Sequence, residues 1–357
     1  MNIIITSPSL DTQQNVSGIS SVTNFIIENN PTSHYIHFEL GKKDNEKGGI
    51  YRLFKIIKSV ILWWIMLNKN KDAIIHYNFP LSKASILRDP IFILIALLKK
   101  KRLIIHIHGG IFLTKETIPF YIKIILKRIF SLNCPFIVLS QKEKELIKNR
   151  FNCNNINILP NCVDLHEAQN YKKEKNLNTP LIIGYIGRIA ESKGIGVLLQ
   201  SCELLKKKNI PFILKFAGKE EVEGQYLNNF REVLGKNFIY EGIVAGERKN
   251  QFIKSLDIFI LPSFFEGLPM SLLECMSFGV VPVTTNVGSI SEIIENNING
   301  IFIEVKDSNS ICEKIIYLNN NRELMQSVST AAQKSIFKNF SPSNYINQLN
   351  NIYKSLY

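Results

Sequence analysis

The sequence is poor in the features that mark metal-binding, disulfide-rich or membrane-spanning proteins. Its six cysteines, at positions 134, 153, 162, 202, 275 and 312, form no CxxC pair and no zinc-ligand spacing, which predicts scattered, buried thiols of a reducing compartment. The longest apolar runs, Val60–Leu67 and Ile91–Leu98, are eight residues each, whereas a spanning helix needs about 20. The N-terminus lacks the basic region and long apolar core of a signal peptide. We therefore expect a cytoplasmic protein without a transmembrane anchor.

Several catalytic motifs are also missing. The sequence has no Asp-x-Asp triad, no cluster of histidines with carboxylates and no Cys–His cluster, so we expect no metal site. A G-x-S-x-G nucleophile elbow is absent, and so is the GK[ST] ending of a Walker loop.

What the chain does have is length and positive charge. Its 357 residues are too many for one ordinary core and predict two domains. The formal net charge is +13 and sits mostly in the first half: residues 1–165 hold 22 Lys and Arg against 11 Asp and Glu. This excess suggests an anionic partner, which can be a substrate, a membrane surface or a nucleic acid.

Short β-rich runs alternate with helical stretches along the whole chain, which predicts parallel sheets covered by helices. The series runs once through residues 1–165 and restarts at Leu181–Ile186. The polar stretch 166–180 between them ends in proline and reads as a linker. The fold class is therefore α/β, with two Rossmann-like, doubly wound domains at 1–165 and 181–340. A helix over 341–357 is expected to pack on either domain.

In such sheets, ligands bind beyond the carboxyl ends of the strands, and one such loop contains Gly187, Arg188, Lys193 and Gly194. Glycine permits close backbone approach, and the helix that begins near Gly194 favours an anion. Arg188 can bind a phosphate through two hydrogen bonds, and Lys193 adds a compact charge. The loop thus fits a diphosphate. A plain turn with solvated charges explains it equally well.

The segment PSFFEGLPMSLLECM, residues 262–276, follows the predicted strand Ile258–Leu261. Ser271 and Glu274 have the spacing of a capping box, so Glu274 can be structural. Glu266 can be an exposed loop acid. The alternative is that both carboxylates accept hydrogen bonds from the hydroxyls of a sugar or ribose.

Two weaker candidates lie in the first half. The predicted strand Leu103–Ile107 leads into His108 and two glycines, and the two-residue period places His106 and His108 on one face. His108 is the better placed to meet a ligand, although a lone histidine is more often packed than catalytic. Gly18 lies in a loop before a helix and forms a weak phosphate cradle.

Taken in order, these pieces resemble glycosyltransferase family 4, the retaining, sugar-nucleotide-dependent enzymes of the GT-B fold. The resemblance covers nearly the whole chain and is strongest over residues 181–304, where PSFFEGLPMSLLECMSFGVVPV is similar to the family's signature. Asn161–Asp164 resembles the Asn-Gly-Val-Asp end of the N-terminal domain, with Cys162 in place of glycine. The front loop has Ser17-Gly18 where the family often has paired glycines.

The resemblance implies a role for each candidate. Arg188 and Lys193 would hold the donor diphosphate, with Gly18 near the donor phosphate. Glu274 would bind the ribose hydroxyls, and Glu266 and His108 would contact the donor sugar. The sugar and phosphate pocket would be lined by Gly267, Leu268, Pro269 and Met270.

The resemblance also implies the chemistry. A hexose or N-acetylhexosamine would pass from a UDP- or GDP-linked donor, with retention and without a metal or other cofactor. The acceptor would be a glycan or a polyprenyl-diphosphate-linked glycan of capsule, O-antigen or lipopolysaccharide. Arg188 and Lys193 would stabilise the negative charge that builds on the leaving diphosphate.

The basic first half suggests that the protein also touches a membrane. Residues 51–67, 91–102 and 121–128 mix apolar and aromatic residues with Lys and Arg, which suits an anionic leaflet on the inner face of the plasma membrane. The same apolar residues are equally needed to cover a parallel sheet.

Other functions stay open at this point. A nucleotide-sugar 2-epimerase or a phosphorylase can share the GT-B fold, although neither an acid/base set nor a pyridoxal site is recognisable. A protein that binds sugar nucleotides without catalysis is a further alternative. We expect no nucleic-acid partner, because no such module is recognisable and the charge is interrupted by long apolar runs.

Overall fold

The computed structural model describes residues 1–15, 17–43, 46, 49–114, 117–173 and 180–357. These residues divide into two compact units. Unit 1 contains Met1–Asn161 together with Pro342–Tyr357, and unit 2 contains Cys162–Ser341. The last helix of the chain therefore belongs to the first unit.

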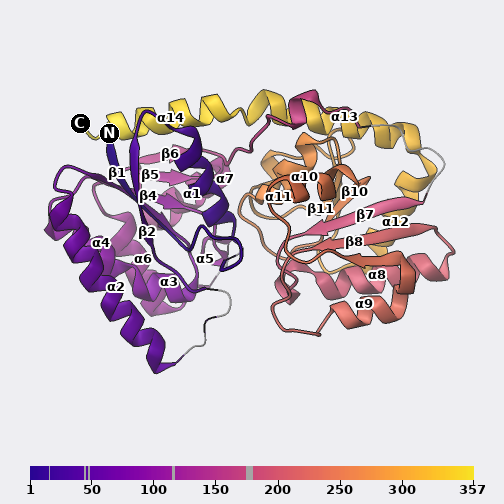
Figure 1. Ribbon diagram of the computed structural model, residues 1–357, viewed down its shortest axis with the longest axis horizontal. Coiled ribbons are helices and arrows are strands. Elements are labelled where there is room, and N and C mark those ends of the chain that lie inside the picture. The colour runs from indigo at the N-terminus through magenta and orange to yellow at the C-terminus, as the bar shows by residue number, and fades with distance from the viewer. Residues whose placement is uncertain (16, 44–45, 47–48, 115–116, 174–179) are drawn as a thin grey trace. The chain divides into compact units, whose positions relative to one another are not determined.

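Unit 1 is built on a six-stranded parallel sheet with the order β2-β1-β3-β4-β5-β6 (Figure 1). Its strands are β1 (Asn2–Ser7), β2 (His34–Glu39), β3 (Ile74–Phe79), β4 (Leu103–Ile107), β5 (Phe136–Val138) and β6 (Ile156–Ile158). β1, β3, β4 and β5 are buried over almost their whole length, as expected for a parallel sheet with helices on both faces.

Eight helices accompany this sheet in the described part of unit 1. They are α1 (Gly18–Asn29), α2 (Ile50–Lys69), α3 (Lys83–Arg88), α4 (Pro90–Leu98), α5 (Ile111–Thr114), α6 (Phe120–Phe130), α7 (Gln141–Phe151) and α14 (Pro342–Lys354). Helices α2, α4 and α6 gather on one side of the sheet, and α14 lies on the other side, where it packs against α1 (Figure 1). Trp63 of α2 is fully buried and donates its indole N–H to the carbonyl oxygen of Phe92 at 3.0 Å.

Unit 2 repeats the plan with the strand order β12-β11-β10-β7-β8-β9. Its strands are β7 (Leu181–Ile186), β8 (Phe212–Ala217), β9 (Phe238–Tyr240), β10 (Ile258–Leu261), β11 (Val281–Thr285) and β12 (Ile301–Ile303). The helices are α8 (Ile195–Lys207), α9 (Leu227–Leu234), α10 (Gly246–Lys254), α11 (Met270–Ser277), α12 (Ser308–Asn320) and α13 (Arg322–Asn339). Helices α8, α9 and α12 lie on one side of the sheet, and α11 and α13 pack together on the other (Figure 1).

The predicted linker 166–180 is only partly described, because 174–179 lie outside the described residues. Its first part packs on unit 2. The ring of Tyr171 meets Phe278 edge-on at 5.6 Å between centroids, and Lys173 donates its ammonium to the carbonyl oxygen of Lys254 at 2.8 Å.

Candidate active site

The strand order of unit 2 reverses between β7 and β10. From β7 the chain adds β8 and β9 on one side and then returns to place β10, β11 and β12 on the other. The connections that leave the carboxyl ends of two such neighbouring strands diverge and leave a crevice, which is where ligands bind in open α/β sheets. The two segments that leave β7 and β10 are Gly187–Gly194 and Pro262–Pro269.

These two loops are packed tightly against each other. The amide of Phe264 donates to the carbonyl oxygen of Ser192 at 3.0 Å. Gly194 has a φ of +71°, and a Cβ there would lie 2.1 Å from the carbonyl oxygen of Pro262. Only glycine fits this position, since it combines the left-handed conformation with close backbone contact. The sequence thus sets the separation of the two loops.

Lys193 and Glu266, one from each loop, form an ion pair. The ammonium nitrogen of Lys193 lies 2.6 Å from Oε1 of Glu266, which also accepts the hydroxyl of Ser263 at 2.6 Å. Glu266 is only 7% exposed, so the interpretation as an exposed loop acid is wrong. Its Oε2 accepts no hydrogen bond from the described residues and stays available to a ligand hydroxyl.

Arg188 is exposed on the loop that follows β7, and a hydrogen bond from a buried side chain holds its backbone. The hydroxyl of the buried Tyr185 donates to the carbonyl oxygen of Arg188 at 2.5 Å. An exposed arginine on a fixed backbone has the chemistry to bind a phosphate through two hydrogen bonds.

Glu274 does not cap its helix. Helix α11 begins at Met270 with Pro269 as the residue before it, and no side chain caps that end. The capping box predicted for Ser271 and Glu274 is therefore wrong, because the residue before the helix is Pro269, two residues earlier than the Ser271 that this spacing requires. Instead, Oε1 of Glu274 accepts from the ammonium of Lys249 on α10 at 2.7 Å. The charge of Glu274 is the main reason why the pKa of Lys249 is raised.

The segment between the two glutamates is held by a third loop. A Cβ on Gly288, which has a φ of +59°, would lie 1.8 Å from the carbonyl oxygen of Glu266. The amide of Ser289 donates to the carbonyl oxygen of Gly267 at 3.2 Å. Leu268 is buried, and Pro269 has no N–H and therefore cannot donate to a ligand.

In unit 1, His108 follows β4, and its ring centroid lies 4.1 Å from that of His106. Its Nε2 lies 2.7 Å from Oδ1 of Asn78 on β3. The Asn78 amide group already donates to the carbonyl oxygen of Thr6 and the hydroxyl of Thr23, at 2.7 and 3.0 Å. Oδ1 must therefore be an acceptor, so Nε2 of His108 carries the proton and Nδ1 carries the lone pair.

A buried chain of side chains continues from this point. Nδ1 of His106 lies 3.1 Å from Nε2 of His76, whose Nδ1 meets the hydroxyl of Tyr353 at 2.6 Å. Burial lowers the pKa of His76 and of His108 to about 3, and lowers that of His106 well below its usual value. All three imidazoles are therefore neutral at pH 7, and His108 is present as a hydrogen-bonding group rather than as a cation.

Gly18 is the first residue of α1, which Ser17 caps by accepting the amide of Ser20 at 3.2 Å. A Cβ added at Gly18 would meet nothing within 4 Å. The protein's own packing therefore does not require glycine at this position.

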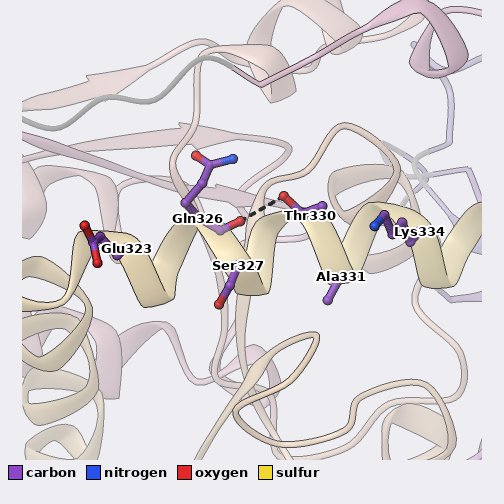
Figure 2. A pocket seen from close by; sticks show the side chains of 6 residues that line it. All are labelled: Glu323, Gln326, Ser327, Thr330, Ala331 and Lys334. Carbon is purple, nitrogen blue, oxygen red and sulfur yellow. Dashed lines mark hydrogen bonds between the residues drawn. The ribbon is translucent and has the colours of Figure 1, made fainter.

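A shallow hollow lies on the surface of α13 (Figure 2). It is lined by Glu323, Gln326, Ser327, Thr330, Ala331 and Lys334. All six come from one helix, and the hydroxyl of Thr330 donates to the carbonyl oxygen of Gln326 at 3.0 Å. None is a predicted site residue, and the hollow offers no convergent set of polar groups.

The geometry has a counterpart in known proteins. Residues 167–335 match the family model of glycosyl transferases group 1. The same stretch contains Arg188, Lys193, Glu266 and Glu274. The chain is therefore similar to glycosyltransferases over this stretch. An uncharacterized glycosyltransferase of Methanocaldococcus jannaschii is 25% identical over 62% of this chain and 60% of its own length.

Two relatives of this chain carry more specific descriptions. The capsular polysaccharide biosynthesis glycosyltransferase CapM of Staphylococcus aureus is 25% identical, over 89% of this chain and 87% of its own. An Escherichia coli enzyme described as UDP-Gal:alpha-D-GlcNAc-diphosphoundecaprenol alpha-1,3-galactosyltransferase is 24% identical, over 84% and 80%.

A solved structure shows which fold this chain has. The sucrose-phosphate synthase of Thermosynechococcus elongatus superimposes with a TM-score of 0.81 at 15% identity, over 99% of this chain and 98% of that one. The fold is GT-B, as the sequence predicted.

Sequence reasoning missed three partners of the predicted site residues. Ser263 is the second residue after the end of β10 and could have been found by that position. Lys249 lies in the polar helix α10, and no spacing in the sequence connects it to Glu274. Asn78 lies on β3, where its type stands out in an otherwise apolar, aromatic and histidine-bearing strand.

Proposed function

We propose that the enzyme transfers a hexose or N-acetylhexosamine from a UDP- or GDP-linked donor to a glycan or polyprenyl-diphosphate-linked acceptor, with retention at the anomeric carbon. The observation that carries the donor half is the meeting of Lys193 and Glu266 at the point where the strand order reverses. One loop brings positive charge for a diphosphate, and the other brings a carboxylate for sugar hydroxyls. This is the division that a sugar nucleotide requires.

The proposed reaction needs charge stabilisation at the leaving group. As the anomeric C–O bond breaks, negative charge builds on the leaving diphosphate, where Arg188 and Lys193 can stabilise it. Oε2 of Glu266 accepts a donor-sugar hydroxyl, while Oε1 keeps Lys193 in place. Glu274 accepts the ribose hydroxyls. In this proposal the chain needs no catalytic metal and no cofactor.

His108 has the protonation state for a contact with the donor sugar. Because Asn78 fixes the proton on Nε2, Nδ1 is an acceptor for a sugar hydroxyl. A neutral imidazole also avoids placing a positive charge next to the anomeric carbon, where positive charge develops in the transition state.

The acceptor class is suggested by the relatives. CapM is described as acting in capsular polysaccharide biosynthesis, and the Escherichia coli enzyme as acting on a diphosphoundecaprenol-linked sugar. We propose a role for this enzyme in surface-polysaccharide biosynthesis, namely of capsule, O-antigen or lipopolysaccharide, at the cytoplasmic face of the membrane. All six cysteines are free and buried, which agrees with a reducing compartment.

A panel of UDP- and GDP-sugars tests the proposal, with and without a polyprenyl-diphosphate-linked glycan. We expect one donor to release free nucleoside diphosphate at a rate that rises strongly with the acceptor, and an α-linked donor to give an α-linked product by NMR. Release that never depends on an acceptor, together with a changed free sugar, would instead indicate the 2-epimerase.

A further inference from the structure

Four helices of unit 1 expose far more apolar surface than the rest of the chain. Of the large apolar side chains that the described residues expose, fifteen lie on α2, α3, α4 and α6 and seven lie elsewhere. Phe54 on α2 and Phe120 on α6 are 65% and 78% exposed. Such a concentration marks an interaction surface, whereas single exposed apolar residues are ordinary.

The exposure is ordered along the helices. Leu87, Ile91, Leu94 and Leu98 follow the spacing of one helical face, and they are 53%, 46%, 54% and 67% exposed. They form one stripe because α3 ends at Arg88 and α4 begins at Pro90, with only Asp89 between them. The opposite face of α4 supplies the core with Phe92 and other buried side chains.

These helices also form a single face. Helix α2 packs against α4, and α3 packs against both α4 and α6. The ammonium of Lys99, at the end of α4, lies 3.6 Å from the ring centroid of Trp64 on α2. The helices lie together on one side of the first sheet (Figure 1). We call this surface, formed by the exposed side chains of α2, α3, α4 and α6, the apolar-basic face.

The charge of this face has one sign. Together the four helices contain nine Lys and Arg and no Asp or Glu. The acid between α3 and α4, Asp89, is fully buried, and its Oδ1 lies 2.5 Å from the guanidinium of Arg88. Lys123, Lys127 and Arg128 are exposed on α6, close in sequence to the exposed Phe120 and Tyr121.

We propose that the apolar-basic face docks on an anionic lipid surface, with its helices lying in the plane of the membrane interface. Apolar and aromatic side chains would enter the boundary between headgroups and acyl chains, and the basic side chains would meet the lipid phosphates. Within the described residues no helix is long and apolar enough to cross a membrane, so the contact is with the surface. A second copy of the chain fits less well, because it would bring two arrays of positive charge together.

Vesicle flotation without any substrate tests this docking. We expect the protein to float with vesicles of mixed phosphatidylcholine and phosphatidylglycerol, to stay behind with phosphatidylcholine alone, and to bind less tightly as salt rises. The variant Lys123→Gln/Lys127→Gln should lower the partition coefficient on the order of 30-fold, from about 1 kcal/mol per basic residue. Leu94→Gln/Leu98→Gln should lower binding to the same vesicles at every salt concentration.

The matched control is Val222→Gln/Ile298→Gln. These residues lie in unit 2 and are 58% and 51% exposed, so the change in exposed apolar area is similar. Binding like that of the unchanged protein supports the proposal. Failure of the unchanged protein to bind the anionic vesicles overturns it. It is also overturned if sedimentation shows dimers that Leu94→Gln/Leu98→Gln dissociates. Because no donor or acceptor is present, neither outcome depends on the proposed reaction.

Discussion

The ammonium nitrogen of Lys193 lies 2.6 Å from Oε1 of Glu266 and joins the loops that follow β7 and β10. The two side chains come from positions 73 residues apart in the chain. Each charge neutralises the other, so neither is left without a partner. In the proposed function, a donor with a negative diphosphate and sugar hydroxyls would meet both groups already positioned.

Removing the positive charges should abolish most transfer. We expect Arg188→Ala and Lys193→Ala each to lower kcat by about 10²–10³, about 2.7–4 kcal/mol, the usual loss of one transition-state donor. Lys193→Ala should also lower the melting temperature, because it leaves Glu266 with the Ser263 hydroxyl alone. Initial rates and thermal denaturation measure the two effects. Near wild-type rates in both folded variants would show that the phosphate assignment is wrong.

The roles of Glu266 and Glu274 can be distinguished by comparing the affinity of each variant for the free nucleoside diphosphate with its affinity for the whole sugar nucleotide. Glu274→Gln should weaken both the nucleoside diphosphate and the sugar nucleotide, by about 10- to 100-fold for hydrogen bonds to a charged group. Glu266→Gln should weaken only the sugar nucleotide. Isothermal titration calorimetry gives these constants. The division of roles fails if Glu266→Gln lowers the affinity for free nucleotide as much as Glu274→Gln does.

Gly18 can be tested for a donor contact with a substitution that should leave the stability of the fold unchanged. A Cβ at this position meets no protein atom within 4 Å, and alanine favours a helix over glycine by up to about 1 kcal/mol. Gly18→Ala should therefore be as stable as the unchanged protein, or slightly more so. If the donor phosphate approaches this amide, KM for the donor rises. An unchanged KM for the donor would contradict the predicted contact between Gly18 and the donor phosphate.

The buried His76 and His106 and the partly buried His108 should make the stability of the fold decrease in acid. Burial lowers the pKa of His76 and His108 from 6.5 to about 3. Between these two pH values the unfolded chain therefore binds protons on these histidines, whereas the folded protein does not. Their stabilisation is complete above pH 6.5 and is lost as pH falls toward 3, by up to about 1.4 kcal/mol per pH unit for each histidine. Urea unfolding between pH 7 and pH 4 measures the slope. His76→Gln should make it shallower, and an unchanged slope would exclude His76 as a source.

Local sequence patterns located the strands Leu103–Ile107, Leu181–Ile186 and Ile258–Leu261 with the ends that the structure shows, because buried parallel strands are short apolar runs between polar breaks. The same reasoning failed at α11, where Met270 rather than Ser271 begins the helix. Glu266 read as exposed because its neighbours are Gly267 and Pro269. Its burial depends on the close approach of Gly288 to the Glu266 backbone and on the hydrogen bond from Ser263, and both contacts form only in the folded chain. The partnership of Lys249 with Glu274 could not be predicted for the same reason, because an ion pair between two different helices produces no periodic pattern in the sequence.

The return of α14 to unit 1 has a consequence for the order in which the protein is made. Tyr345 packs edge-on against Phe25, and Tyr353 is fully buried against His76. During synthesis the ribosome delivers all of unit 2 before these side chains appear. The half of the protein that is translated first is thus completed last, because the surface of unit 1 that α14 covers stays exposed to solvent until α14 has been synthesised.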